Sequence, residues 1–359
     1  SDLAPYWVPA RMLLARSLIA TGEEQAGLDA ARDLVMAPDA DIATHLEYAL
    51  LLAATGRQEE ARAMLLPYAT GDSVVPGAVR TLGVMDLDAG DLDAAGKRFE
   101  DLLSTGVQSY DALYFLGMIA ERRGNPDQAL RYFTRVAGGE FMLPAQGRAA
   151  RIRAKQGGLD AGLEYLDQFA RAHPQRGPDL VATRAGLAAS LGDTVRATRI
   201  LDAGLAQYPD SLDLRMARVF AYERAGRGDA AIRELRQLLA ERPGDATVQN
   251  ALGYALADRN KNLDEAAALI SASLAQMPDS AAVLDSMGWV LFRQGRPRDA
   301  LPYLERAARL GDDPEIALHL GEVQAALGDA AAARATWQKA LEANPDDARL
   351  KERLERDRP

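Results

Sequence analysis

The chain has 359 residues, of which 48% are hydrophobic, 26% are charged and only 6% are aromatic, a composition typical of folded, water-soluble proteins. The formal net charge is -10 and the acidic and basic residues are interspersed, which excludes the basic stripe that a nucleic-acid-binding surface requires. The absence of cysteine excludes disulfides, thiolate nucleophiles and cysteine-ligated metals.

The chain opens on SDLAPYWVPARMLLARSLIA, which is apolar and helical in pattern but lacks the polar face of a first repeat. We therefore expect the sequence to begin partway through a longer protein, with Trp7 covering this end or touching an upstream repeat. Self-association through the apolar N-terminal repeat is the other interpretation that stays open. The sequence has no run of about 18 apolar residues, the pattern that predicts a transmembrane helix, and no signal peptide is recognisable.

A turn residue then recurs every 33 to 35 positions along the whole chain. The turn residues are Gly22, Gly56, Gly90, Gly124, Gly157, Gly192, Gly226, Asn260, Gly295 and Gly328. Glycine and asparagine are the residues that adopt positive φ most readily. Since each turn residue separates two apolar helical runs, each is predicted to join the two helices of a hairpin.

Two further series have the same period and consist almost entirely of alanine and glycine. One precedes the turn: Ala15, Ala49, Gly83, Gly117, Ala150, Ala185, Val219, Gly253, Gly288 and Gly321. The other follows it: Gly27, Ala61, Ala95, Ala129, Gly162, Ala197, Ala231, Ala266, Ala300 and Ala333. Because two helices approach to roughly 8 Å only at small residues, these positions predict where the helices of each hairpin cross.

Large apolar residues such as Phe99, Leu304 and Trp337 fill the space around each crossing, and several hairpins end in proline. A pattern of small, large and proline positions every 34 residues is typical of tetratricopeptide repeats. The sequence therefore predicts an all-α, right-handed superhelical solenoid. Ten repeats span residues 1–345, and the segment 346–359, DDARLKERLERDRP, forms a capping helix.

Nothing in the sequence predicts catalysis. His45, His173 and His319 are far apart in a linear solenoid, so they are expected to be structural or solvated rather than to share a metal. No nucleophile elbow, phosphate-binding loop or zinc motif is present. We expect no catalytic residue, no metal site and no cofactor, and therefore a binding protein rather than an enzyme.

A stack of helical hairpins instead forms a groove lined by the first helices, which takes protein partners. The residues predicted to line it are Met216, Phe220, Arg224, Asn250, Tyr254, Asp258, Asp285, Trp289, Phe292 and Arg293. Aromatic and arginine side chains dominate interface hot spots. Trp289 and Tyr254 have a second interpretation, in which they pack between repeats. A carboxylate clamp is not supported, because the positions that would need lysine and asparagine carry other residues.

Three successive stretches point to a particular family: NALGYALADRNKNLDEAAALI (250–270), DSMGWVLFRQGRPRDALPYLERA (285–307) and HLGEVQAALGDAAAARATWQKAL (319–341). Together they resemble bacterial tetratricopeptide lipoproteins of Gram-negative outer membranes, which are adaptors of periplasmic carboxyl-terminal processing proteases. The resemblance covers about the last hundred residues. The lipid-bearing cysteine of the family is absent from this sequence.

The resemblance implies a scaffold that binds such a protease and delivers protein substrates, among them cell-wall hydrolases. It also implies a periplasmic location, with a lipid anchor at an N-terminus outside this chain. The alternative is a tetratricopeptide scaffold for envelope assembly or exopolysaccharide export, without a protease.

Overall fold

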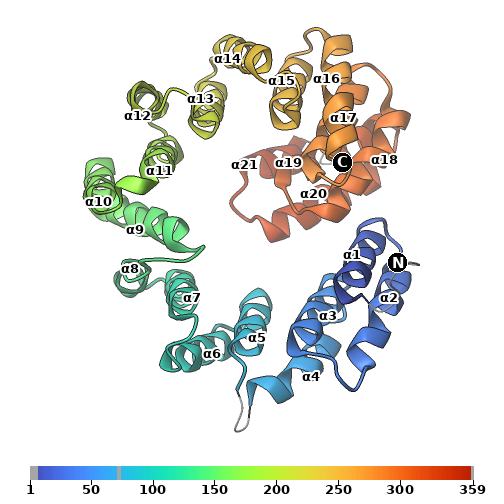
Figure 1. Cartoon of the computed structure of the whole chain (residues 1–359). Coiled ribbons are helices and arrows are strands. Elements are labelled where there is room, and N and C mark those ends of the chain that lie inside the picture. The colour runs from blue at the N-terminus through green and yellow to red at the C-terminus, as the bar shows by residue number, and fades with distance from the viewer. Residues whose placement is uncertain (1–6, 71–73, 357–359) are drawn as a thin grey trace. The chain divides into compact units, whose positions relative to one another are not determined.

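The computed structural model describes residues 7–70 and 74–356, and within these ranges the chain is helical, without strands (Figure 1). The helices are α1 (Val8–Ala20), α2 (Glu24–Met36), α3 (Ile42–Ala54), α4 (Gln58–Ala69), α5 (Pro76–Asp88), α6 (Leu92–Ser104), α7 (Ser109–Arg122), α8 (Pro126–Phe133), α9 (Met142–Gly157), α10 (Leu159–Ala172), α11 (Gly177–Ser190), α12 (Thr194–Gln207), α13 (Leu212–Arg224), α14 (Gly228–Glu241), α15 (Ala246–Asp258), α16 (Leu263–Gln276), α17 (Ala281–Arg293), α18 (Pro297–Leu310), α19 (Pro314–Ala326), α20 (Ala330–Ala343) and α21 (Ala348–Arg356). A short 3₁₀ helix, Pro174–Arg176, precedes α11. The all-α prediction is confirmed.

Contacts within the chain divide it into two compact units. Unit 1 comprises Ser1–Ile19 and Glu23–Ala221, and unit 2 comprises Ala20–Gly22 and Tyr222–Pro359. The boundary falls inside α13, the first helix of the seventh hairpin. Two predicted groove residues, Met216 and Phe220, therefore belong to unit 1, whereas the other eight belong to unit 2.

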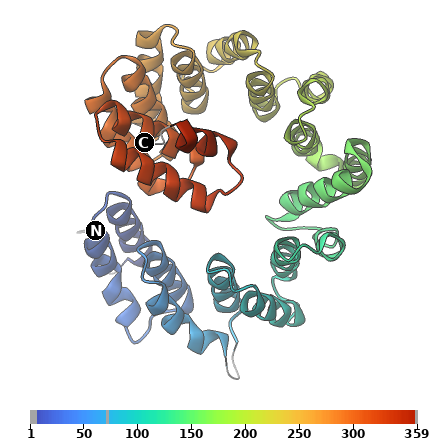
Figure 2. The same ribbon diagram turned by 180° about the vertical axis from the view of Figure 1, so that it is seen from behind.

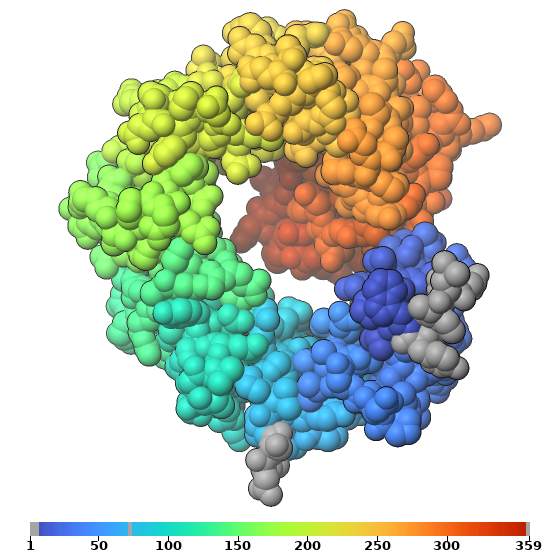
Figure 3. Space-filling view, in the orientation of Figure 1, coloured from blue at the N-terminus to red at the C-terminus, as the bar shows by residue number. Residues whose placement is uncertain are grey.

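Both units are built from the same hairpin. In unit 1, α3 packs on α4, α5 on α6 and α7 on α8, and each second helix also contacts the first helix that follows it. Unit 2 repeats the arrangement with α15 and α16, α17 and α18, and α19 and α20, which Figure 2 shows from behind. In the space-filling view, the successive hairpins of unit 1 form a continuous surface (Figure 3).

The turns between paired helices use positive φ. Gly295 has φ +78° between α17 and α18, and Asn260 has φ 54° at the equivalent turn between α15 and α16. The predicted turn residue of the fifth repeat, Gly157, is wrong by one position. The helix α9 continues through Gly157, and Gly158 leaves it with φ 85° and ψ 166°. With two adjacent glycines, the second can adopt a conformation that only glycine tolerates, so the helix gains one more residue.

Close contact between paired helices depends on the predicted small residues. A Cβ atom added to Gly288 would lie 2.5 Å from Cγ of Leu304, so the second helix rests directly on the glycine backbone. At the equivalent crossing of the last hairpin, a Cβ atom on Gly321 would overlap the indole of Trp337. Each glycine thus receives the large residue 16 positions later, and both large residues are fully buried.

The C-terminal helix α21 covers the last hairpin. Leu350 and Leu354 are buried in the cluster of Trp337, and the guanidinium of Arg353 lies 5.3 Å from the centre of the Trp337 ring. Residues 357–359 of the predicted capping segment lie outside the described residues, as do residues 1–6 of the predicted apolar start. At the other end of the chain, Trp7 and Leu13 are exposed. Within residues 7–70 and 74–356, no helix combines the length and the apolar character needed to cross a membrane.

Candidate functional site

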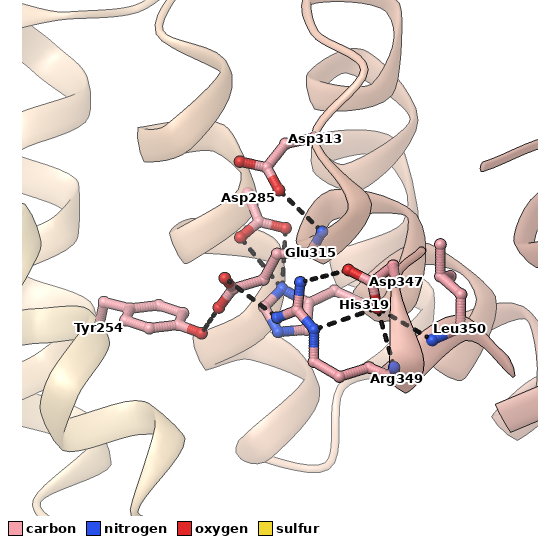
Figure 4. Close-up of polar contacts among 8 residues, drawn as sticks. All are labelled: Tyr254, Asp285, Asp313, Glu315, His319, Asp347, Arg349 and Leu350. Carbon is pink, nitrogen blue, oxygen red and sulfur yellow. Dashed lines mark hydrogen bonds and ion pairs between the residues drawn. The ribbon is translucent and has the colours of Figure 1, made fainter. Parts of the chain in front are cut away.

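The candidate site lies in unit 2, where consecutive first helices pack side by side. Helix α17 contacts α15 on one side and α19 on the other, and α21 follows at the end of the array. The hairpins repeat in register, so equivalent positions of these helices face the same direction. Figure 4 shows the polar contacts that connect them.

A buried pair joins α17 to α19. The Nδ1 atom of His319 lies 2.9 Å from Oδ1 and 3.0 Å from Oδ2 of Asp285, and both residues are about 94% buried. Burial raises the pKa of the Asp285 carboxyl, and the hydrogen bond from His319 opposes this effect. The sequence assigned His319 a structural or solvated role, and the structure gives it a partner in the neighbouring repeat.

Trp289 packs on this pair. Its ring stacks on the imidazole of His319, with 4.0 Å between the ring centroids. The guanidinium of Arg293 lies 5.4 Å from the centroid of the indole. Trp289 is only 6% exposed, and its Nε1 has no hydrogen-bond partner among the described residues. Of its two predicted placements, Trp289 therefore occupies the one between repeats. Phe292, with its ring 5.5 Å from the indole, is half-buried beside it.

A second contact reaches across α17 from α15 to α19. The hydroxyl of Tyr254 donates a hydrogen bond to Oε1 of Glu315 (Figure 4). Burial raises the pKa of the Tyr254 hydroxyl, and the negative charge of Glu315 raises it further, so the group remains a donor. Arg349 of α21 lies 3.7 Å from the other oxygen of Glu315. The network thus connects three first helices and the capping helix.

These contacts form one wall of a hollow of about 370 Å³. Its lining includes Tyr254, Asp258, Trp289, Glu315, Leu318, His319, Glu322, Arg349, Glu352, Arg353 and Arg356. Arg353 pairs with Glu322, and Arg356 pairs with Glu352. Aromatic rings beside arginines and carboxylates are typical of surfaces that bind proteins, because the rings make hydrophobic contacts and the charged groups make polar ones.

The remaining predicted groove residues are distributed unevenly. Asp258 and Arg224 are exposed, Arg293 is partly exposed, and Asn250 is half-buried with an Oδ1 atom that has no partner among the described residues. In unit 1, Phe220 is 60% exposed and Met216 is buried. Asp285 is also buried, so it acts within the protein rather than on its surface.

Eight of the eleven lining residues were not predicted from the sequence: Glu315, Leu318, His319, Glu322, Arg349, Glu352, Arg353 and Arg356. The separation of 34 residues between Asp285 and His319 equals one repeat and was the available signal for that pair. No group of three or more histidine, aspartate or glutamate side chains in residues 7–70 and 74–356 is arranged to hold a metal ion.

Comparison with known proteins places these features in a family. Models described as tetratricopeptide repeat match residues 42–67, 81–141, 188–254 and 286–348, together more than half of the chain. The TPR repeat-containing protein PA4667 of Pseudomonas aeruginosa is 36% identical over 213 residues, which are 59% of this chain and 36% of that protein. The chain therefore spans about a third of the length of this curated relative.

One solved structure supports the fold at a TM-score above 0.5. Yeast Tom70 matches with a TM-score of 0.54 at 15% identity, over 99% of this chain and 81% of that chain. The thermophilic TPR protein TTC0263 of Thermus thermophilus matches at 22% identity with a TM-score of 0.46, over 50% of this chain and 98% of that one. From its repeated hairpins and these matches, the chain belongs to the tetratricopeptide repeat family, whose fold is a scaffold for protein–protein interaction.

Proposed function

We propose that this protein is a non-enzymatic adaptor that binds a carboxyl-terminal processing protease and presents protein substrates to it, such as cell-wall hydrolases. One observation carries the proposal. The three stretches that resemble the adaptor family, 250–270, 285–307 and 319–341, supply five of the eleven residues that line the hollow, among them Tyr254 and Trp289. The sequence signal and the candidate contact surface thus coincide in unit 2.

The chemistry of the hollow supports a protein partner over a small substrate. Arg349, Arg353 and Arg356 lie on one helix, α21, and each is paired with a carboxylate. Paired charges around a partly buried aromatic ring favour orientation and specificity at a protein interface. We extend the proposal to location: the protein works in the periplasm, held at the outer membrane by a lipid on an N-terminus outside this chain.

The test uses the purified chain with the carboxyl-terminal processing protease and a cell-wall hydrolase of the same bacterium. Because an adaptor raises the effective concentration of substrate at the protease toward ~mM, cleavage of dilute hydrolase should be at least about tenfold faster in its presence. Tight binding of the protease with no change in the cleavage rate would contradict the adaptor function.

A matched pair of variants links the effect to the hollow. Arg356 lines it and is largely exposed, so Arg356→Glu should reduce the acceleration without unfolding the protein. Arg199 is exposed on α12 of unit 1 and is not part of the lining of this hollow, so Arg199→Glu should retain the full acceleration. An equal loss in both variants would show that net charge, and not this surface, governs the effect. Fractionation of the native bacterium tests the proposed location.

A further inference from the structure

A second hollow lies in unit 1, on the side of the second helices. It is bounded by α2 and α4, the second helices of the first two hairpins, and α3 packs against both to form its floor. Its volume is about 640 Å³, and its lining includes Gln25, Asp29, Arg32, Val35, Met36, His45, Tyr48, Leu52, Arg57, Glu60, Ala63, Met64, Pro67 and Tyr68. All of these residues belong to unit 1, whereas the candidate site is in unit 2.

One end of the hollow is apolar. Val35 is buried in its wall, Met36 is 75% exposed at its edge, and Met64 is partly exposed on the opposite helix. The imidazole of His45 makes an edge contact with the ring of Tyr68 at 5.4 Å between centroids. Two methionines and an aromatic ring around an open space form a surface that adapts to different apolar side chains.

The other end of the hollow is polar, and its acidic groups are already engaged. Both carboxylate oxygens of Glu60 accept hydrogen bonds from Arg57 at 2.5 Å. Oδ1 of Asp29 accepts a hydrogen bond from Gln25 at 3.0 Å. The carboxylates at this end therefore have donors within the protein.

Two donors between these ends lack acceptors. Tyr48 is 93% buried, and burial raises the pKa of its hydroxyl, which therefore stays protonated. Within residues 7–70 and 74–356, neither the Tyr48 hydroxyl nor the exposed Arg32 guanidinium has a hydrogen-bond or ion-pair partner. A ligand that fits this place should supply an acceptor, and a carboxylate would satisfy both groups.

The dimensions of the hollow favour a short helix. The lining residues of α2 extend from Gln25 to Met36, twelve residues that span about 16 Å along the helix axis. This length equals about three turns of an α-helix, enough for apolar anchors at i, i+3 or i+4, and i+7. An amphipathic helix binds by laying its apolar face in a hydrophobic groove, and the space between α2 and α4 above α3 has the form of such a groove.

We propose that this hollow is a second docking surface, which takes an amphipathic helical segment of a partner protein. Leucine-like side chains of the segment pack against Met36, Met64 and Tyr68. An acidic side chain of the segment accepts hydrogen bonds from Tyr48 and Arg32. The surface requires neither a protease nor the hollow of unit 2, so this inference goes beyond the proposed adaptor function and fails independently of it.

The test is fluorescence anisotropy of labelled synthetic peptides, about 14 residues or four helical turns long, titrated with the whole chain. The first peptide carries leucines at helical i, i+3 and i+7 spacing and one glutamate a turn away. The second replaces this glutamate with glutamine, and the third has the composition of the first in scrambled order. The first peptide should bind at least about tenfold more tightly than the scrambled one, because only it presents a continuous apolar stripe.

Variants of the chain then locate the contact. Tyr48→Phe should weaken binding of the first peptide about three- to tenfold, and Arg32→Gln about tenfold, because each removes one donor to a charged acceptor. Both substitutions should weaken binding of the glutamine peptide less, because its uncharged amide oxygen accepts only weaker hydrogen bonds from the two donors. The matched controls Tyr110→Phe and Arg199→Gln, at an exposed tyrosine and an exposed arginine elsewhere, should bind the first peptide like the unaltered chain.

A blocking variant completes the test. Ala63 is exposed within the hollow, so Ala63→Trp should fill it and abolish binding while the helical circular dichroism signal is retained. Equal binding of the ordered and scrambled peptides, or undiminished binding by Ala63→Trp, would overturn the proposal. Failure of all three peptides to bind, with binding of dodecanoate instead, would also overturn it by showing a site for small amphiphiles.

Discussion

The imidazole of His319 faces the carboxylate of Asp285, with its Nδ1 atom 2.9 Å from Oδ1. The two residues are 34 positions apart, so corresponding turns of neighbouring first helices bring them together across the boundary between two hairpins. Trp289 stacks on the imidazole and keeps the pair from water. The contact therefore stabilises the packing of α17 on α19, and through it the wall of the candidate site.

Removing the Asp285 carboxylate should destabilise unit 2. Asp285→Ala leaves a buried imidazole without its partner, which should lower the free energy of unfolding by about 3 kcal/mol. Urea unfolding followed by circular dichroism measures the loss, and hydrogen exchange of α17 and α19 amides locates it. Asp312→Ala, at an exposed aspartate near the start of α19, should change the free energy by no more than about 0.5 kcal/mol. Equal stability of the two variants would contradict the structural role of the pair.

The stability of the capping helix α21 should depend on pH through the carboxyl group of Asp347. The carboxylate of Asp347 accepts hydrogen bonds from the backbone N–H groups of Arg349 and Leu350 and from the Arg349 guanidinium at 3.0 Å. The guanidinium is the largest cause that lowers the pKa of Asp347 below its ordinary value of 3.8. A lowered pKa means that the stabilisation is complete above 3.8 and is lost as the pH falls through the lower, folded-state pKa.

Asp347→Ala should therefore destabilise α21 by about 1 kcal/mol at neutral pH and have no effect at pH values well below 3.8. Hydrogen exchange of the α21 amides measures the difference. Asp346→Ala, at the exposed neighbour, is the matched control and should leave exchange unchanged at both pH values. A difference between Asp347→Ala and the unaltered chain that persists at low pH would show that the carboxylate is not the stabilising group.

Two Gly→Ala substitutions should change the free energy of unfolding in opposite directions. A Cβ atom on Gly321 meets the buried indole of Trp337, so Gly321→Ala should cost about 1–3 kcal/mol through overpacking. Gly186 lies inside α11 with no atom within 4 Å of an added Cβ, so Gly186→Ala should stabilise the helix by about 0.5–1 kcal/mol. Thermal or urea unfolding measures both. Stabilisation by Gly321→Ala would mean that α19 and α20 do not approach closely at this crossing.

A substitution at the exposed Phe220 should affect partner binding without affecting the stability of the fold. Its side chain is 60% exposed, so Phe220→Ala should change the free energy of unfolding by no more than about 0.5 kcal/mol. If it lies in the partner surface predicted from the sequence, the same substitution should weaken protease binding at least about fivefold, or about 1 kcal/mol. Surface plasmon resonance measures the affinity. Leu191→Ala, at an apolar residue 43% exposed, is the control. An unchanged affinity in both variants would remove Phe220 from the proposed contact surface.

Much of the fold follows from local rules that can be read along the chain. The small residue at Gly288, the large residue at Leu304 and the turn at Gly295 have relative positions that suit two antiparallel helices. The same logic failed by one residue at Gly157 and Gly158, because two adjacent glycines offer two places for the turn and the sequence does not distinguish them. In the structure Gly158 takes the positive φ.

The candidate site was only partly predictable. Periodicity correctly assigned Asp285 and Trp289 to first helices, but it could not show which neighbour each side chain would contact. His319 was isolated in the sequence, and only the packing of α17 on α19 placed its ring between Asp285 and Trp289. The hollow between α2 and α4 has no motif of its own, since it arises from side chains of three helices.

The amino-acid sequence by itself determined the helices, their pairing and the family of this protein, because these depend on spacing and residue size within about 34 positions. Only the tertiary structure decided which polar groups are buried together, as with Tyr254 and Glu315, and which donors stay free, as with Tyr48. The physical reason is that burial and hydrogen bonding depend on contacts between repeats, and side-chain direction at those contacts is set by packing rather than by order along the chain.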